Sequence, residues 1–273
     1  MATCLPAWGG GGGAGAHKGL ENGHGGRSVP DCMPAALLLK YPGTNCDHET
    51  ARALEAVGFT TRTVPIARIT PGDLADTDLV VLSGGFSYGD YVMAGRIAQL
   101  QTESKVGDAL RGFAAGGGYV LGVCNGFQIL VKLGLLPAGS LIDNTSGRFL
   151  CRWTRLRKQD NRSPFLQLLP DEFELPVAHA EGRFVAPDGL AVEYRRNGLA
   201  ALTYVEDING SSEGIAGLQS ENGRIFGLMP HPERFLYRRH HYDPDWNGHP
   251  EWGWGYFFFL GLAQALAAEA VSR

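Results

Sequence analysis

The sequence lacks two motifs that would by themselves suggest a function. Its five cysteines form no Cys-x-x-Cys pair, and no Gly-Lys dipeptide occurs anywhere in the chain. The first absence argues against zinc-ribbon and thioredoxin-type motifs, and the second excludes the Walker A loop of P-loop nucleotide-binding proteins. Because an odd number of unpaired cysteines favours free thiols in a reducing compartment, we expect a cytoplasmic protein.

Long apolar runs and an excess of positive charge are also missing. The longest apolar stretches, AALLLKY (35–41) and YFFFLGLAQAL (256–266), fall short of the roughly 20 residues that span a membrane. The N-terminus has no secretory signal pattern. With 24 Lys and Arg against 28 Asp and Glu, the net charge is −4, which argues against nucleic acid as the main partner.

Glycine, by contrast, is abundant, with 39 residues. Residues 1–32 are rich in it and contain almost nothing to bury, so we expect a disordered leader. Folded structure should begin at about Met33. The remaining length fits one domain over 33–273, with a loop insertion at 236–255 before a C-terminal helix.

Strand and helix patterns alternate from Met33 to about residue 136. This alternation predicts an α/β fold, with a three-layer, mostly parallel open sheet and helices on both faces. Short strands should follow after about residue 148, and a helix over roughly 256–270 should end the chain. The expected early strands are 35–41, 60–66, 77–85 and 118–123, and the expected early helices are 47–58, 94–118 and 125–136.

A cysteine stands between two glycines where the fourth strand meets a helix, in YVLGVCNGFQ (119–128). Ligands of open parallel sheets bind beyond the carboxyl ends of the strands, and Cys124 falls at such an end. Gly122 and Gly126 would permit the sharp turn of a nucleophile elbow. The following helix N-terminus favours a thiolate and an adjacent oxyanion. We therefore predict that Cys124 is a nucleophile, the alternative being a small buried hydrophobic side chain.

A candidate base and its orienting group lie in GLMPHPERF (227–235). If Pro230 and Pro232 hold this segment extended, His231 and Glu233 point to the same side. The carboxylate can then bind one ring nitrogen and leave the other for a thiol. Taken alone, the His-x-Glu pattern would favour a surface histidine and glutamate in a turn. Together with the elbow, it favours a base and its orienting group.

A third segment, LSGGFSYGDY (82–91), has a glycine pair directly after a strand. Glycines in this position leave backbone N–H groups able to face a carbonyl oxygen. An ordinary strand-to-helix turn is the alternative. The prediction gains weight because the segment agrees with the other two motifs.

Together, GVCNGFQIL, GGFSYGDY and MPHPER resemble the class I, triad-type glutamine amidotransferases. Within that family, YPGTNCD (41–47) and AHAEGR (178–183) also resemble the glutaminase subunits of phosphoribosylformylglycinamidine synthases. The resemblance runs from about residue 35 to 235. It implies a flavodoxin-like three-layer fold. It also implies a chain that hydrolyses glutamine and delivers ammonia to an ATP-using subunit, which makes formylglycinamidine ribonucleotide in purine biosynthesis.

The resemblance assigns a role to each matched residue. Cys124 would attack glutamine and form a thioester. His231 would activate the thiol and protonate the leaving amine, and Glu233 would orient His231. Backbone N–H groups of Gly85 and Asn125 would form the oxyanion hole. The residues expected to line the glutamine pocket are Gly84, Phe86, Gln128 and His179.

No cofactor and no metal are expected in this chain, because the resemblance places ATP and Mg²⁺ on the synthetase subunit. A large synthetase subunit and a small bridging subunit are the expected partners. Two alternatives remain open from the residues alone. The chain could be an amidotransferase subunit for another acceptor, or a related α/β cysteine hydrolase. It could also be a non-catalytic scaffold of the same fold.

Two segments depart from a simple interpretation. The insertion at 236–255 contains Trp246, Trp252 and Trp254, for which we expect an exposed anchor on the synthetase. Its histidines, together with the neighbouring residues, lack the spacing of a metal site. Cys46, in NCDHE, coincides with a helix start, and we expect it to be structural and to lie near the edge of the site.

Overall fold

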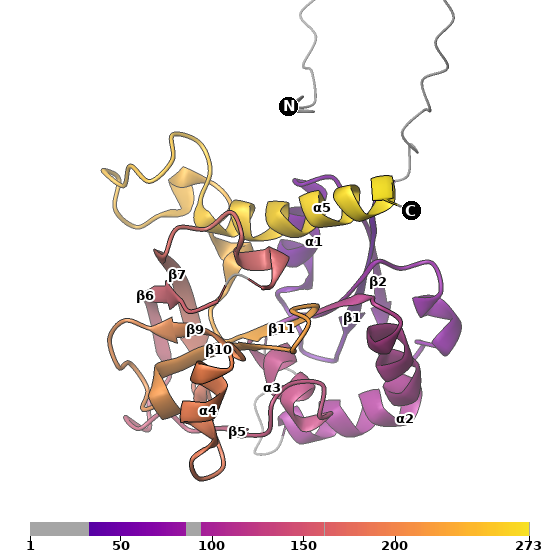
Figure 1. Cartoon of the computed structure of the whole chain (residues 1–273), viewed down its shortest axis with the longest axis horizontal. Helices are drawn as coiled ribbons and strands as arrows, with labels where there is room; N and C mark the ends of the chain where they lie inside the picture. The colour runs from indigo at the N-terminus through magenta and orange to yellow at the C-terminus, as the bar shows by residue number, and fades with distance from the viewer. Residues whose placement is uncertain (1–32, 86–93, 161, 273) are drawn as a thin grey trace, which may run out of the picture. The chain divides into compact units, whose positions relative to one another are not determined.

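The computed structural model describes residues 33–85, 94–160 and 162–272. The expected disordered leader over 1–32 lies outside these residues. A nine-stranded sheet organises the described part, with strand order β2-β1-β3-β4-β11-β10-β9-β6-β7. This part forms a single compact unit around that sheet (Figure 1).

The first five strands in this order are parallel. All side chains of β3 and β4 are buried, as expected where helices cover both faces of a parallel sheet. The carboxyl ends of these strands therefore share one edge. The strands are β1 (Ala35–Lys40), β2 (Thr60–Pro65), β3 (Leu79–Leu82), β4 (Tyr119–Val123) and β11 (Ile225–Leu228).

Helices cover both faces of the parallel part, which confirms the predicted α/β layers. Helices α1 and α5 lie on one side of the sheet, and α2 and α3 lie on the other (Figure 1). The helix bounds are α1 (Asp47–Glu55), α2 (Ala94–Ala115), α3 (Asn125–Lys132), α4 (Leu190–Arg196) and α5 (Trp254–Ser272). The sequence patterns did not predict the short helix α4.

The other four strands pair antiparallel, so the sheet is mixed. Because each step reverses the direction, β9 and β7 run the same way as β11, and their carboxyl ends reach the same edge as that of β4. These strands are β10 (Ile215–Gln219), β9 (Ala200–Tyr204), β6 (Leu150–Lys158) and β7 (Glu172–His179). Two short strands form a separate ribbon, β5 (Ser140–Ile142) with β8 (Arg183–Val185).

Short 3₁₀ turns connect several of these elements. Three of them begin with a proline, which suits the first position of a helical turn. Their bounds are η1 (Pro71–Leu74), η3 (Pro164–Leu166), η4 (Ser212–Gly214), η5 (Pro232–Arg234) and η6 (Arg238–His240).

The C-terminal helix corrects one expectation. By length and composition, α5 is apolar enough to cross a membrane, because the helix continues for 19 residues through an alanine-rich end. The judgement that this run is too short was therefore wrong. A core helix passes the same test, and α5 buries Phe258, Phe259 and Leu262 in the hydrophobic core. Gly261 lets the helix approach the backbone carbonyl of Pro164 in η3.

The insertion at 236–255 corrects another expectation. Its three tryptophans are half-buried and pack within the chain. Trp246 and Trp254 meet edge to face at 5.5 Å, and Trp252 stacks on Tyr256 at 4.0 Å. Among the aromatic side chains of this insertion, Tyr242 is the exposed one, at 65%. The three tryptophans are therefore not the exposed side chains on which the predicted synthetase anchor was based.

Candidate active site

Cys124 occupies a strained backbone position at the end of β4. Its φ and ψ angles are 51° and −107°, and among the described non-glycine residues only Glu213 shares a positive φ. Such a conformation costs about 1–3 kcal/mol and persists only where surrounding structure enforces it. Here the Cys124 N–H donates to the carbonyl of Leu228 at 2.8 Å. The turn thus presents the thiol at the carboxyl edge of the sheet, as the elbow pattern predicts.

The two flanking glycines permit this turn by close backbone approach. A Cβ on Gly126 would collide with the carbonyl group of Leu82 at the end of β3. A Cβ on Gly122 would lie 2.6 Å from the carbonyl oxygen of Gly126. Any larger residue at either position would push α3 away from the sheet, so the Gly-x-Cys-x-Gly pattern has a direct steric cause.

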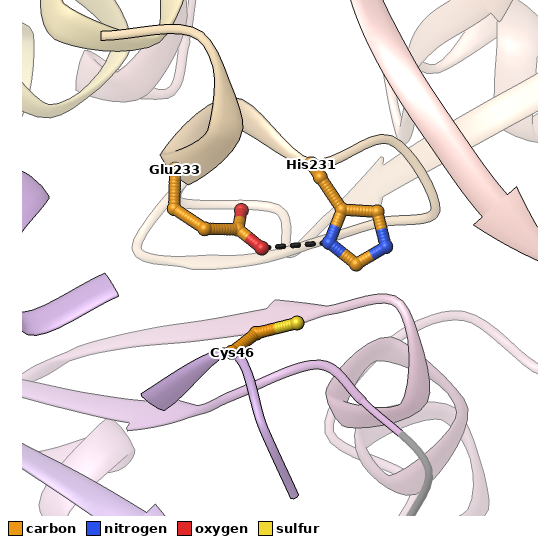
Figure 2. Close-up of side chains that lie close together, drawn as sticks. All are labelled: Cys46, His231 and Glu233. Atoms are coloured by element: carbon orange, nitrogen blue, oxygen red, sulfur yellow. Dashed lines mark hydrogen bonds and ion pairs between the residues drawn. The ribbon is translucent and has the colours of Figure 1, made fainter. Parts of the chain in front are cut away.

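His231 and Glu233 form a buried pair. Nδ1 of His231 and Oε1 of Glu233 are 2.6 Å apart, and neither residue is more than 2% exposed. The expected extended segment is only partly correct, since β11 ends at Leu228 and Pro232 starts the 3₁₀ turn η5. Proline suits the first position of a helical turn because its φ is already set. The turn still brings both side chains to one side (Figure 2).

Gly84 lies between the nucleophile and the base. A Cβ at Gly84 would be 3.0 Å from Cε1 of His231 and 3.2 Å from Cβ of Cys124. Nε2 of His231 is buried and has no hydrogen-bond partner among the described residues. One ring nitrogen is therefore held by Glu233, while the other remains able to exchange a proton with a thiol.

The electrostatics of His231 favour its charged form. Burial by itself lowers the pKa of His231, but the Glu233 carboxylate and the neighbouring Cys124 outweigh burial, and the net pKa is well above the ordinary value. A protonated imidazole next to a sulfur is the arrangement that stabilises a thiolate.

The predicted oxyanion-hole residues follow the ends of two neighbouring strands, β3 and β4. Asn125 begins α3, so its N–H belongs to the first turn, where helix amides have no intrahelical acceptor. Gly85 follows β3 with φ of +117°, and its Cα faces Asn45 so closely that no side chain would fit. Phe86, the other residue expected in this segment, lies outside the described residues.

The predicted pocket residues Gln128 and His179 lie around the segment 179–182. Gln128 donates from Nε2 to the carbonyl of Glu181 at 2.7 Å. His179, at the end of β7, places Nδ1 3.1 Å from Oδ1 of Asn144. The Asn144 amide nitrogen donates to the carbonyls of Arg148 and His179. Its Oδ1 is therefore the acceptor, and the proton of His179 sits on Nδ1.

His179 consequently presents an unprotonated nitrogen. Burial, together with the charge of His231, lowers the pKa of His179 to about 4. Its Nε2 is buried without a hydrogen-bond partner among the described residues. A neutral imidazole with a free acceptor can receive a hydrogen bond from an ammonium or amide group of a ligand.

Two further residues lie at the site: Tyr204, which the sequence did not suggest, and Cys46, which was expected near its edge as a structural residue. Tyr204 ends β9 at the same edge, and its hydroxyl is buried without a partner in the described part of the chain. Burial raises the pKa of Tyr204, and the nearby Cys124 adds to the shift. Cys46 is fully buried, and its sulfur lies beside His231 and Glu233 (Figure 2). The sequence signal is their position: Tyr204 is the last residue of a strand that ends at this edge, and Cys46 lies in the loop that follows another.

Comparison with known proteins agrees with this geometry. Residues 33–258 match the family model of the CobB/CobQ-like glutamine amidotransferase domain. The chain is 41% identical over 203 residues to phosphoribosylformylglycinamidine synthase subunit PurQ of Thermotoga maritima, covering 74% of this chain and 88% of that protein. It is 40% identical over 239 residues to the PurQ subunit of Thermus thermophilus, covering 84% and 98%.

A solved structure shows the same relationship. The structure described as PurLQS from Thermotoga maritima contains a chain that superposes with a TM-score of 0.72 at 36% identity, covering 86% of this chain and all of that one. The chain therefore belongs to the glutamine amidotransferases and, within them, to the family of phosphoribosylformylglycinamidine synthase subunits PurQ.

Proposed function

We propose that this chain hydrolyses glutamine at Cys124 and supplies the ammonia to a synthetase subunit, which makes formylglycinamidine ribonucleotide in purine biosynthesis. One observation carries the assignment of residues. Cys124 stands in a strained elbow beside His231, whose Nδ1 is held by Glu233 at 2.6 Å and whose Nε2 has no partner among the described residues. This is the arrangement of a nucleophile, a base and an orienting group.

The first half of the reaction forms a thioester. His231 takes the thiol proton on Nε2, and the sulfur of Cys124 attacks the side-chain carbonyl carbon of glutamine. The tetrahedral intermediate then collapses, the carbon–nitrogen bond breaks, and His231 returns its proton to the leaving amine, which departs as ammonia. Glu233 keeps the imidazole oriented and stabilises its positive charge throughout.

The second half releases glutamate. Water gives a proton to Nε2 of His231 and attacks the thioester carbonyl, and the sulfur leaves and is reprotonated. Both tetrahedral intermediates carry a negative oxygen. We assign its stabilisation to the backbone N–H groups of Gly85 and Asn125, worth about 10²–10³-fold in rate per donor.

Glutamine itself would be held by Gly84, Gln128 and His179. Gln128 supports the segment 179–182 through the carbonyl of Glu181, and His179 offers an unprotonated Nε2. The α-ammonium group of an amino acid is a suitable donor for that nitrogen. Phe86 stays a predicted pocket residue.

The partners are proposed from the relatives. The Thermotoga maritima relative was solved in PurLQS, and we propose the corresponding assembly for this chain, with a large synthetase subunit and a small bridging subunit. ATP and Mg²⁺ would act on the synthetase. The free thiols of Cys46, Cys124 and Cys151 fit a reducing compartment, and we propose the cytoplasm.

The assignment is tested in the assembled complex. Glutamate and ammonia are measured with purified synthetase partners, for the wild type, Cys124→Ala and Cys151→Ala. Cys124→Ala should lose at least ~10³-fold in turnover, whereas Cys151→Ala, at an exposed position on β6, should retain the wild-type rate. Full turnover in Cys124→Ala would reject Cys124 as the nucleophile. Absence of glutamine hydrolysis in the wild-type complex would support the scaffold alternative.

A further inference from the structure

A second thiol, that of Cys46, lies beside the proposed base. The sulfur of Cys46, a ring nitrogen of His231 and a carboxylate oxygen of Glu233 all lie within 4.8 Å of one another. Figure 2 shows the Cys46 sulfur pointing toward the space between the Glu233 carboxylate and the imidazole ring. The three residues are at most 2% exposed. The proposed reaction uses His231 and Glu233 and gives no role to Cys46.

These three donors match the preference of a zinc-type cation. Sulfur, imidazole nitrogen and carboxylate oxygen are the usual protein ligands of Zn²⁺, and three of them leave a position open. Bonds of about 2.0–2.3 Å to a tetrahedral ion place its ligand atoms roughly 3.3–3.8 Å apart. The donors therefore need to move by only about an ångström from their present separations.

Unused hydrogen-bonding capacity at Glu233 supports the same conclusion. Oε2 of Glu233 is buried without a partner in the described part of the chain. A buried carboxylate oxygen without a donor costs free energy, and a cation would remove that cost. A thiolate and a carboxylate together would also balance the charge of a divalent ion.

Arg234 currently occupies the outer side of this cluster. Its Nη2 contacts the sulfur of Cys46 at 3.0 Å, and its Nε lies 3.3 Å from Oε2 of Glu49. The Arg234 side chain is 31% exposed. The guanidinium can therefore leave the sulfur and stay paired with Glu49. In its present position it competes with any cation for Cys46.

We propose that Cys46, His231 and Glu233 form a binding site for a thiophilic divalent cation such as Zn²⁺, and that its occupancy switches off the glutaminase. On binding, the Cys46 thiol releases its proton to solvent and the sulfur becomes a metal ligand. His231 gives a ring nitrogen to the ion and Glu233 a carboxylate oxygen. With His231 and Glu233 both bound to the ion, the imidazole loses the orientation that Glu233 gives it. It can then no longer accept a proton from Cys124.

The inhibitory part rests on the proposed function, whereas the binding part does not. Binding is therefore measured first, on the purified full-length chain without its partners. Chelator-treated protein is titrated with Co²⁺, and the near-ultraviolet charge-transfer band of a cobalt–thiolate bond is recorded. Zn²⁺ affinity follows from displacement of Co²⁺.

Three variants locate the site. Cys46→Ala should lose the charge-transfer band and weaken Zn²⁺ binding by at least about tenfold. Cys124→Ala should keep the band, because Cys124 is not one of the three ligands. Arg234→Met should bind the ion more tightly, by about tenfold or more, because a competing positive charge next to the sulfur is gone. The thiols and histidines of residues 1–32 are present in every variant, so they cancel in these comparisons.

The outcomes separate the two parts of the proposal. An unchanged band in Cys46→Ala, or its loss in Cys124→Ala with Cys46 intact, would overturn the site. If the band behaves as expected, Zn²⁺ should inhibit ammonia release by the wild-type complex, and Cys46→Ala should be less sensitive by the same factor as its loss of affinity. Equal inhibition of both proteins would overturn the regulatory role while leaving the site in place. A complex that never hydrolyses glutamine would instead contradict the proposed function.

Discussion

Nδ1 of His231 and Oε1 of Glu233 are 2.6 Å apart in a pair whose side chains are almost fully buried, at 1% and 0% exposure. In such a setting an ionic hydrogen bond is strong, and loss of one partner leaves the other uncompensated. The pair therefore links the orientation of the imidazole to its protonation state. The protonation state can be followed through the pH dependence of activity, and the orientation through the turnover at the pH optimum.

Replacing Glu233 by Gln should lower the pKa of His231, because the carboxylate is the leading contribution that raises it. If the charged imidazole protonates the leaving amine, activity falls as the pH rises through that pKa. The basic limb of the glutaminase pH profile should therefore move to lower pH in Glu233→Gln. Turnover at the optimum should also fall by about 10²–10⁴-fold.

Glu174→Gln is a matched control for this prediction. Glu174 contacts His241 at 3.1 Å in a second carboxylate–histidine pair, which lies outside the proposed site. Its replacement should leave the pH profile unchanged. Equal shifts in both variants would mean that the profile does not report His231.

His179 should make the fold sensitive to acid. Its pKa is lowered to about 4 in the folded chain, against an ordinary value near 6.5. Between these values the unfolded chain binds a proton that the folded chain does not. The free energy of unfolding therefore falls as the pH drops through this range, by roughly 2–3 kcal/mol at pH 4.5.

Urea unfolding at pH 7 and pH 4.5 checks this contribution. His179→Gln should lose less stability between the two pH values than the wild type, by about the same 2–3 kcal/mol. His48→Gln removes a histidine whose side chain is 86% exposed. This variant should lose as much stability between the two pH values as the wild type does. If His179→Gln and the wild type lose the same amount of stability between pH 7 and pH 4.5, the pKa of His179 is not lowered.

The sequence predicts those parts of the site that depend on local geometry. Gly122 and Gly126 indicate the turn at Cys124 because only a missing side chain permits the close approach of α3 to β3. His231 and Glu233 are two residues apart, so their meeting is also a local matter, although a 3₁₀ turn replaces the expected extended segment.

Features set by strand order could not be predicted in the same way. Cys46 was expected near the edge of the site because it follows β1, but its approach to the His231–Glu233 pair was not predicted. Tyr204 reaches the site only because β9 ends at the same edge as β4. The second half of the sheet continues antiparallel, with that order fixed by long-range pairing. The tryptophans of the insertion look exposed among glycines and prolines, yet they pack on one another and on α5. Local composition contains no information on such contacts.

Gly126 should tolerate no side chain. In Gly126→Ala the new Cβ meets the backbone carbonyl of Leu82, which cannot rotate away. Overpacking of this kind costs typically 1–3 kcal/mol or more. We expect the variant to lose stability in urea unfolding and to react slowly with a glutamine-analogue electrophile at Cys124.

Gly112→Ala is the control for this prediction. Gly112 lies in α2, and a Cβ there would have no atom within 4 Å. The free energy of unfolding should therefore rise by about 0.5–1 kcal/mol. Similar stabilities for the two variants would reject the steric account.

Tyr204 allows stability and function to be separated. Its hydroxyl is buried next to Cys124 without a partner among the described residues, and an unsatisfied buried hydroxyl costs about 1–3 kcal/mol. Tyr204→Phe should therefore leave the free energy of unfolding unchanged or raise it. If the hydroxyl binds glutamine, KM should increase at the same time, with kcat less affected.

Tyr194→Phe provides the contrast, because the Tyr194 hydroxyl donates to the carbonyl of Ala138 at 3.0 Å. Removing a satisfied hydrogen bond should cost about 1 kcal/mol of stability and leave KM unchanged. If the free energy of unfolding rises in Tyr204→Phe and falls in Tyr194→Phe, the partner of the Tyr204 hydroxyl is a group of the substrate. If Tyr204→Phe instead loses stability and keeps its KM, the hydroxyl has a structural role and contributes nothing to glutamine binding. A polar group that is costly to the folded chain and lies beside the nucleophile is best explained by a ligand that satisfies it.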